Sequence, residues 1–170
     1  NISIAEEETL LILGDSISAG YGINKKDNWV YLMQQKFDEE GNSIKLINSS
    51  VSGDTTGGGL GRLAKNLKKF KPDFVLIELG GNDALRGYSI KLIKSNLEKM
   101  IALIKQNKSK VLLMQIRIPP NYGQKYMLAF EKIYKDLALS EEVYLLPFML
   151  EEIGINSELM QPDGIHPNKK

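Results

Sequence analysis

Three side chains of this sequence could together carry out acyl transfer: the hydroxyl of Ser16, the imidazole of His166 and the carboxylate of Asp163. His166 is the only histidine, so any mechanism that needs an imidazole base must use it. Asp163 precedes it by three residues and can reach the ring within one turn. A nucleophile, a base and an orienting acid are the groups that hydrolysis through an acyl-enzyme requires. Taken alone, however, Gly14-Asp15-Ser16 is more typical of a turn that ends a strand.

Two further residues could stabilise the oxyanion that forms during acyl transfer. Gly53, in the run Ser52-Gly53-Asp54, can present its backbone N–H without obstruction by a side chain. Asn82 can donate a hydrogen bond from its side-chain amide. We interpret the neighbouring Asp54 and Asp83 as residues that hold loop backbone, because Asp readily accepts from nearby N–H groups.

These polar residues follow segments that the sequence predicts to be buried strands, alternating with helices. Such alternation is typical of βαβ units around a parallel sheet. We therefore expect an α/β fold, a three-layer α/β/α doubly wound sheet of five strands that is flavodoxin-like, in the order 2-1-3-4-5. The carboxyl ends of its strands would bring the polar loops to one edge. The expected strands are 9–13, 44–48, 74–79, 111–116 and 143–146.

Helix signals lie between these strands. Asp27 is expected to cap a helix that buries Trp29, Leu32, Met33 and Phe37 and stops at Gly41. Apolar residues at helical spacing predict further helices around 60–70 and 126–137, and a short one over 148–153. Ser89 is expected to cap the helix whose buried stripe consists of Ile93, Leu97, Met100, Ile101 and Ile104.

Composition excludes several classes of function. A net charge of +1 offers no electrostatic basis for binding nucleic acid, and no apolar run is long enough to span a bilayer. One histidine and no cysteine argue against a metal site. Gly57-Gly58-Gly59 lacks the Lys-Ser/Thr of a P-loop, and we expect no cofactor. We expect a monomer, periplasmic or secreted if Asn1 follows a cleavage site and cytoplasmic otherwise, because residues 1–8 do not resemble a signal peptide.

The polar clusters, taken together, resemble the four sequence blocks of the SGNH hydrolases, also called the GDSL esterase/lipase superfamily. Nearly the whole chain from Leu10 onward takes part, and the resemblance is greatest to the bacterial acyl-thioesterase, arylesterase and lysophospholipase branch. The segments that carry it are Ile12–Ser16, Ser52–Thr55, Glu78–Asp83 with Leu85-Arg86-Gly87, Leu113–Arg117, Asn121-Tyr122-Gly123 and Asp163–Asn168.

The resemblance implies a serine hydrolase that cleaves carboxylic esters or thioesters of acyl chains. It implies that Ser16 is the nucleophile and also an N–H donor to the oxyanion, that Gly53 and Asn82 are the other donors, and that Asp163 and His166 complete the triad. Members of this branch continue past the histidine block into a final helix, whereas this chain stops at Lys170. The expectation is a single domain over residues 1–170 without that helix.

Substrate selectivity should come from the loops that rim the strand ends, 84–88 and 117–122. From these loops we expect Leu85, Arg86, Ile118 and Pro119 to contact a small-molecule acyl ester or thioester. Their mostly apolar character suits an acyl chain better than a sugar. Two alternatives remain open: a carbohydrate or small-molecule deacetylase of the same superfamily, and a non-catalytic flavodoxin-like binding module.

Overall fold

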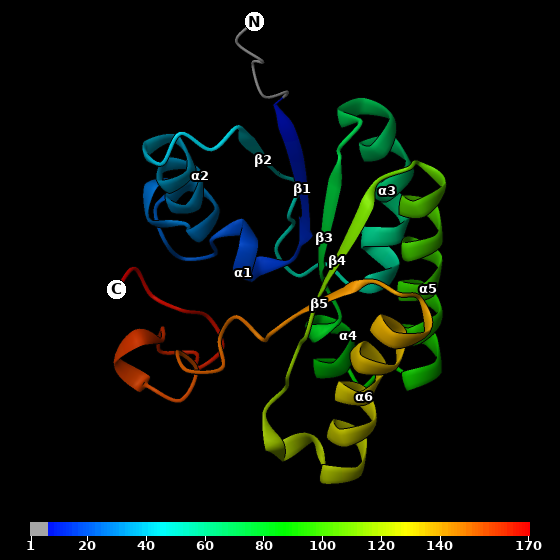
Figure 1. The fold of residues 1–170 in the computed structure, drawn as a ribbon. Helices are drawn as coiled ribbons and strands as arrows, with labels where there is room; N and C mark the ends of the chain where they lie inside the picture. The colour runs from blue at the N-terminus through cyan, green and yellow to red at the C-terminus, as the bar shows by residue number, and fades with distance from the viewer. Residues whose placement is uncertain (1–6) are drawn as a thin grey trace, which may run out of the picture.

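The fold of the computed structural model is a five-stranded parallel sheet with helices on both faces (Figure 1). The structure describes residues 7–170, so most of the segment considered above for a signal peptide lies outside the described residues. The strands are β1 (Glu8–Gly14), β2 (Ile44–Asn48), β3 (Phe74–Glu78), β4 (Lys110–Met114) and β5 (Tyr144–Leu146). Their order is β2-β1-β3-β4-β5, so the predicted fold class and strand order are confirmed.

The longer helices are α2 (Trp29–Glu39), α3 (Thr56–Phe70), α5 (Ile90–Gln106) and α6 (Gln124–Ser140). Helix α2 lies on one face of the sheet, whereas α3, α5 and α6 cover the other (Figure 1). Ser89 caps α5 as expected, its side chain accepting from the backbone N–H of Leu92. All five apolar residues predicted for the buried stripe of this helix are fully buried. Within the described residues, no helix combines the length and apolar character needed to cross a bilayer.

Helix α2 differs from the expectation in both its cap and its buried face. Asn28, not Asp27, caps it by accepting from the N–H of Val30. Leu32 and Met33 are exposed, because the helix turns Gln34 towards the edge strand β2. The Gln34 amide donates to the Ile44 carbonyl and accepts from the Leu46 N–H, which satisfies backbone groups that an edge strand leaves unpaired.

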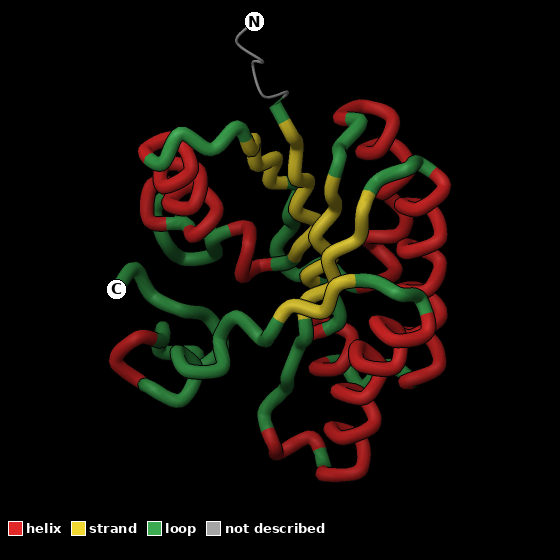
Figure 2. The backbone as a smooth tube through the Cα atoms, viewed as in Figure 1, coloured by secondary structure: helices red, strands yellow, loops and turns green. Residues whose placement is uncertain are grey.

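The carboxyl edge of the sheet carries short segments that the sequence did not predict. Figure 2 shows how much of this edge is loop and turn, broken by short helical pieces. These pieces are α1 (Ser16–Ala19), α4 (Gly81–Leu85), and the 3₁₀ turns η1 (Lys25–Asp27), η2 (Pro120–Tyr122) and η3 (Ser157–Leu159). The prediction of a short helix at 148–153 is wrong, because residues 149–155 form a run of turns, with hydrogen bonds such as that from the Gly154 N–H to the Leu150 carbonyl.

Candidate active site

Ser16 is the first residue of α1, immediately beyond the end of β1. The side chain of Asp15 caps this single turn by accepting from the Ile17 N–H at 3.0 Å. Gly14 must lack a side chain here, because a Cβ would lie 2.5 Å from Oε2 of Glu78 on the neighbouring strand β3. The sharp passage from strand to helix therefore presents the Ser16 hydroxyl at the carboxyl edge of the sheet.

Asp163, His166 and Ser16 form a continuous line of hydrogen-bonding contacts. Nε2 of His166 lies 2.8 Å from Oγ of Ser16, and Nδ1 lies 2.7 Å from Oδ2 of Asp163. Because an ionised carboxylate can only accept, Nδ1 carries the proton and Nε2 is left to accept from the Ser16 hydroxyl. The three residues that the sequence marked for acyl transfer are thus brought together across 150 residues of chain.

Asp163 is held in its charged form by the turn that it organises. Its Oδ1 accepts from the backbone N–H groups of Ile165 and His166 at 2.9 and 3.0 Å. The His166 N–H and ring, together with the Ile165 N–H, lower the pKa of Asp163 to about 2. One carboxylate oxygen therefore shapes the turn while the other orients the imidazole.

The segment that carries His166 is fastened to the loop after α1 by two residues that the sequence did not single out. Gln161 donates from its side-chain amide to the Tyr21 carbonyl at 2.8 Å and to the Pro167 carbonyl at 2.9 Å. The Tyr21 ring lies 4.7 Å from the His166 ring, centroid to centroid. A single glutamine or tyrosine in a loop gives no pattern that could have revealed this contact.

The expected oxyanion donors converge on the same cavity as Ser16 and His166. Asn82 lies on α4, just beyond β3, and its amide donates to the Asp54 carbonyl at 2.9 Å and to Oδ2 of Asp15 at 3.2 Å. Gly53 adopts a left-handed conformation with φ of 78°. Asp54 and Asp83 hold backbone as interpreted: Asp54 accepts from the Thr55 N–H, and Asp83 accepts from the N–H and hydroxyl of Thr56.

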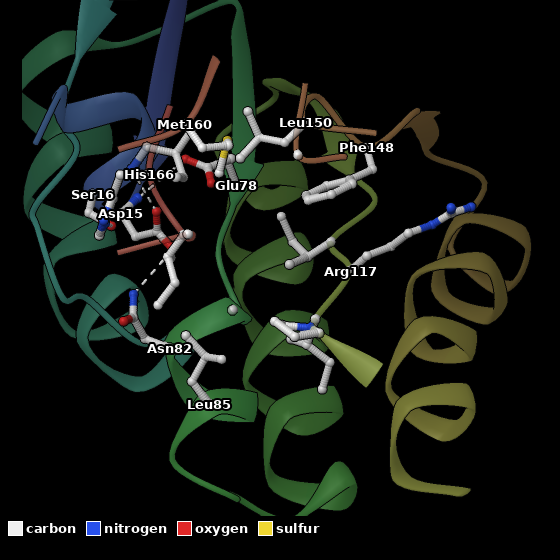
Figure 3. Close-up of a pocket in the computed structure, with 18 of the residues that line it drawn as sticks. Asp15, Ser16, Glu78, Asn82, Leu85, Arg117, Phe148, Leu150, Met160 and His166 are labelled. Carbon is white, nitrogen blue, oxygen red and sulfur yellow. Dashed lines mark hydrogen bonds between the residues drawn. The ribbon is translucent and has the colours of Figure 1, made fainter. Parts of the chain in front are cut away.

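The cavity that opens from the triad has a volume of about 700 Å³ and is lined mainly by apolar side chains. Figure 3 shows Ser16, His166 and Asn82 at one end and Phe148 and Leu150 at the other. Leu85, Ile118 and Pro119, which we expect to contact the substrate, are among its lining residues. Arg86 is not; its guanidinium instead donates to the Gly53 carbonyl at 3.0 Å. The lining residues that the sequence did not reveal include Ile116, Phe148, Leu150, Ile155, Met160 and Ile165.

Arg117 lies at the rim, where it joins two segments around the cavity mouth. Its guanidinium is 2.6 Å from a Glu151 oxygen and 3.9 Å from a Glu131 oxygen, and it points away from the cavity (Figure 3). All three side chains are partly exposed, so these ion pairs contribute little to stability. Arg117 and Glu151 are also among the residues that line the cavity, so their ion pair is a charged part of its rim.

Comparison with known proteins identifies the family. The sequence pattern of the GDSL-like lipase/acylhydrolase family matches residues 12–170. The chain belongs to this family. An arylesterase of Vibrio mimicus is 51% identical over 160 residues, which are 94% of this chain and 80% of that protein. The Escherichia coli thioesterase 1/protease 1/lysophospholipase L1 is 45% identical over 165 residues, 97% of this chain and 78% of that protein.

A solved structure agrees with this membership of the GDSL-like family. The psychrotrophic esterase EstA from Pseudoalteromonas sp., inhibited by monoethylphosphonate, superposes with a TM-score of 0.94 at 42% identity. The match covers 95% of this chain and 88% of EstA. This chain is therefore a carboxylic ester hydrolase. This confirms the expected enzyme class and removes the alternative of a non-catalytic binding module.

Proposed function

We propose that this protein hydrolyses carboxylic esters and thioesters of acyl chains through an acyl-enzyme on Ser16. The observation that carries the proposal is the line from Oγ of Ser16 through the His166 ring to Asp163, with contacts of 2.8 and 2.7 Å. This line opens into the apolar cavity, so a bound acyl group would meet the nucleophile at the cavity's polar end.

Each group has a defined part in this reaction. As Oγ of Ser16 bonds to the carbonyl carbon, its proton moves to Nε2 of His166, and the Asp163 carboxylate stabilises the imidazolium. The N–H groups of Ser16 and Gly53 and the amide of Asn82 donate to the oxyanion. His166 then protonates the leaving alcohol or thiol, and a water activated by the same ring releases the acid.

The cavity favours an acyl chain of medium or greater length as the substrate. The triad and the oxyanion donors recognise the carbonyl alone, and they do not distinguish an ester from a thioester. The apolar lining by residues such as Ile118, Leu150 and Met160 would bury methylene groups of the acyl chain. A sugar would need several polar partners that these residues do not offer.

Covalent labelling tests the nucleophile directly. A fluorophosphonate should modify the wild-type protein once, at Ser16, and mass spectrometry of the peptide would locate the adduct. Ser16→Ala should abolish both labelling and acyl-enzyme formation while the protein stays folded. Ser52→Ala is a matched control, because Ser52 lines the same cavity without contacting His166, and it should still be labelled. Near-wild-type turnover by folded Ser16→Ala would refute the proposal.

A further inference from the structure

Two buried carboxyl groups lie side by side directly behind the nucleophile. Glu78 ends β3 and Asp15 follows β1, and the register that pairs Gly14 with Glu78 sets them next to each other. Asp15 is 5% exposed and Glu78 is 3% exposed. The backbone N–H of Asp15 lies 3.4 Å from Oε2 of Glu78, and each carboxyl group alters the pKa of the other. Neither belongs to the triad or to the oxyanion donors.

The directions of the hydrogen bonds around these two carboxyl groups follow from the groups that can only donate. The Trp29 indole can only donate, and it does so to Oγ of Ser18 at 3.2 Å. The Ser18 hydroxyl therefore donates onward to Oε2 of Glu78 at 2.6 Å. On the other carboxyl group, Ile17 N–H and the Asn82 amide donate to Asp15. Both carboxyl groups thus act as acceptors on their outer sides, and a hydrogen bond between them requires a proton on one.

No counter-ion neutralises this pair. Within residues 7–170, no Lys, Arg or His side chain forms an ion pair with Asp15 or Glu78. The nearby Arg62 is paired with Asp54, and His166 is engaged by Ser16 and Asp163. Tyr134, which donates to the Leu79 carbonyl, also lies near both carboxyl groups, and Asp54 lies near Asp15. Two adjoining buried carboxylates without a cation cannot both be ionised.

The proton belongs on Glu78. Burial raises the pKa of the Glu78 carboxyl well above its usual range, and the negative charge of Asp15 raises it further. Burial also raises the pKa of Asp15, but the Ile17 N–H, the hydrogen bond from Glu78 and the nearby His166 oppose that rise. Glu78 is therefore the neutral donor and Asp15 the charged acceptor.

We infer that Glu78 is a positioning residue for the oxyanion donor: its protonated carboxyl donates to Asp15, and Asp15 holds the amide of Asn82. The chain of contacts runs from Trp29 on α2 through Ser18, Glu78 and Asp15 to Asn82 on α4. The Asp15 carboxylate and the Asp54 carbonyl together fix the orientation of the amide before substrate arrives. The proton also limits the pair to one negative charge beside the place where the oxyanion develops. The catalytic part of this inference rests on the proposed function of Asn82.

Infrared difference spectroscopy tests the proton independently of catalysis. At about pH 8, solvent-exposed Asp and Glu side chains are ionised, so a protonated-carboxyl C=O band reports only buried acids. The wild-type protein should show a band that is missing from Glu78→Gln. The raised pKa of Asp83 does not confuse the comparison, because any contribution from Asp83 is present in both proteins. A protonated-carboxyl region that is the same in wild type and Glu78→Gln would overturn the inference.

Kinetics test the positioning role. Glu78→Ala should lower kcat roughly 10- to 100-fold with little change in KM, a part of what one oxyanion donor contributes. Glu78→Gln should restore most of that loss, because its amide can donate to Asp15 while its carbonyl accepts from Ser18. Glu98→Gln, on the outer surface of α5, is the matched control and should leave kcat and KM unchanged. Thermal melting establishes that each variant is folded.

The outcomes separate this inference from the proposed function. A folded Glu78→Ala with wild-type kcat, or one that changes KM alone, would overturn the positioning role. Failure of Glu78→Gln to recover kcat where the alanine variant has lost it would do the same. Full activity of Ser16→Ala would instead remove the proposed function, and the infrared comparison would still report whether Glu78 holds the proton.

Discussion

Replacing Asn82 by alanine should slow turnover without weakening substrate binding. The substitution removes the one side-chain donor of the proposed oxyanion site and leaves the backbone N–H groups of Ser16 and Gly53 in place. Alanine suits the helical backbone of α4, so the helix itself should persist. Asn82→Ala should cost about 10²–10³-fold in kcat, or about 3–4 kcal/mol of transition-state stabilisation. KM should change little, because the donor meets a full oxyanion only in the transition state.

The structure indicates why the effect should be this large. The two N–H donors of the Asn82 amide are held by the Asp54 carbonyl at 2.9 Å and by the Asp15 carboxylate at 3.2 Å. One donor exchanges its acceptor for the developing oxyanion, while the other keeps the amide at the polar end of the cavity. Steady-state kinetics on a p-nitrophenyl ester would measure the loss, and fluorophosphonate titration would count the competent sites. Asn24→Ala is the control, because Asn24 is exposed, donates to Asp27 and is not among the residues that line the cavity. A raised KM with unchanged kcat would refute the oxyanion role.

Three further predictions concern pH, stability and substrate. Because the pKa of Asp163 lies near 2, below its usual 3.8, its carboxylate stabilises the fold above about pH 4 and this contribution is lost as the pH falls towards 2. Asp163→Asn should therefore be less stable than wild type at neutral pH and should have a lower kcat. In an acid titration followed by circular dichroism, the stabilities of the two proteins should become equal at low pH. Equal stability at neutral pH would contradict this. Asp83→Ala should lower the free energy of unfolding in urea by about 1–3 kcal/mol, because it leaves the buried N–H of Thr56 without an acceptor; an unchanged midpoint would contradict it. With one leaving group throughout, kcat/KM should rise by at most about fourfold per added methylene until the cavity is full, and a preference for acetyl esters would instead favour the deacetylase alternative.

Local patterns in the sequence were enough to predict the sheet and most of its helices. The apolar stripe from Ile93 to Ile104 is buried, and Ser89 caps the helix that carries it. Both features could be predicted because they depend on residues within a few positions of one another. Helix α2 was harder to predict. Its periodicity pointed to Leu32 and Met33, but hydrogen bonding between Gln34 and the edge strand decided which side faces inward.

The reacting groups of the site could be predicted from the sequence, but the residues that line the far wall of the cavity could not. Ser16, Gly53 and Asn82 directly follow strands or lie close after them, and parallel strands bring such loops to one edge of the sheet, where they line one cavity. The far wall of the cavity comes from 148–165, a segment of turns with one short 3₁₀ turn, in which no periodicity marks the residues that line the cavity. The prediction that Arg86 lines the cavity was also wrong. Arg86 follows a short helix, and the direction of its side chain depends on its hydrogen-bond partner, the Gly53 carbonyl.

The sequence by itself determined the order of the elements and the identity of the reacting groups, since alternating apolar segments and a single histidine leave few choices. Only the tertiary structure decided what surrounds those groups. The pairing of Asp15 with Glu78 depends on strand register, and the contact of His166 with Ser16 depends on how the last segment crosses the sheet edge. The physical reason is that helices and strands arise from interactions between neighbours in the chain, whereas charge, burial and proton sharing in the site arise between residues 60 to 150 positions apart.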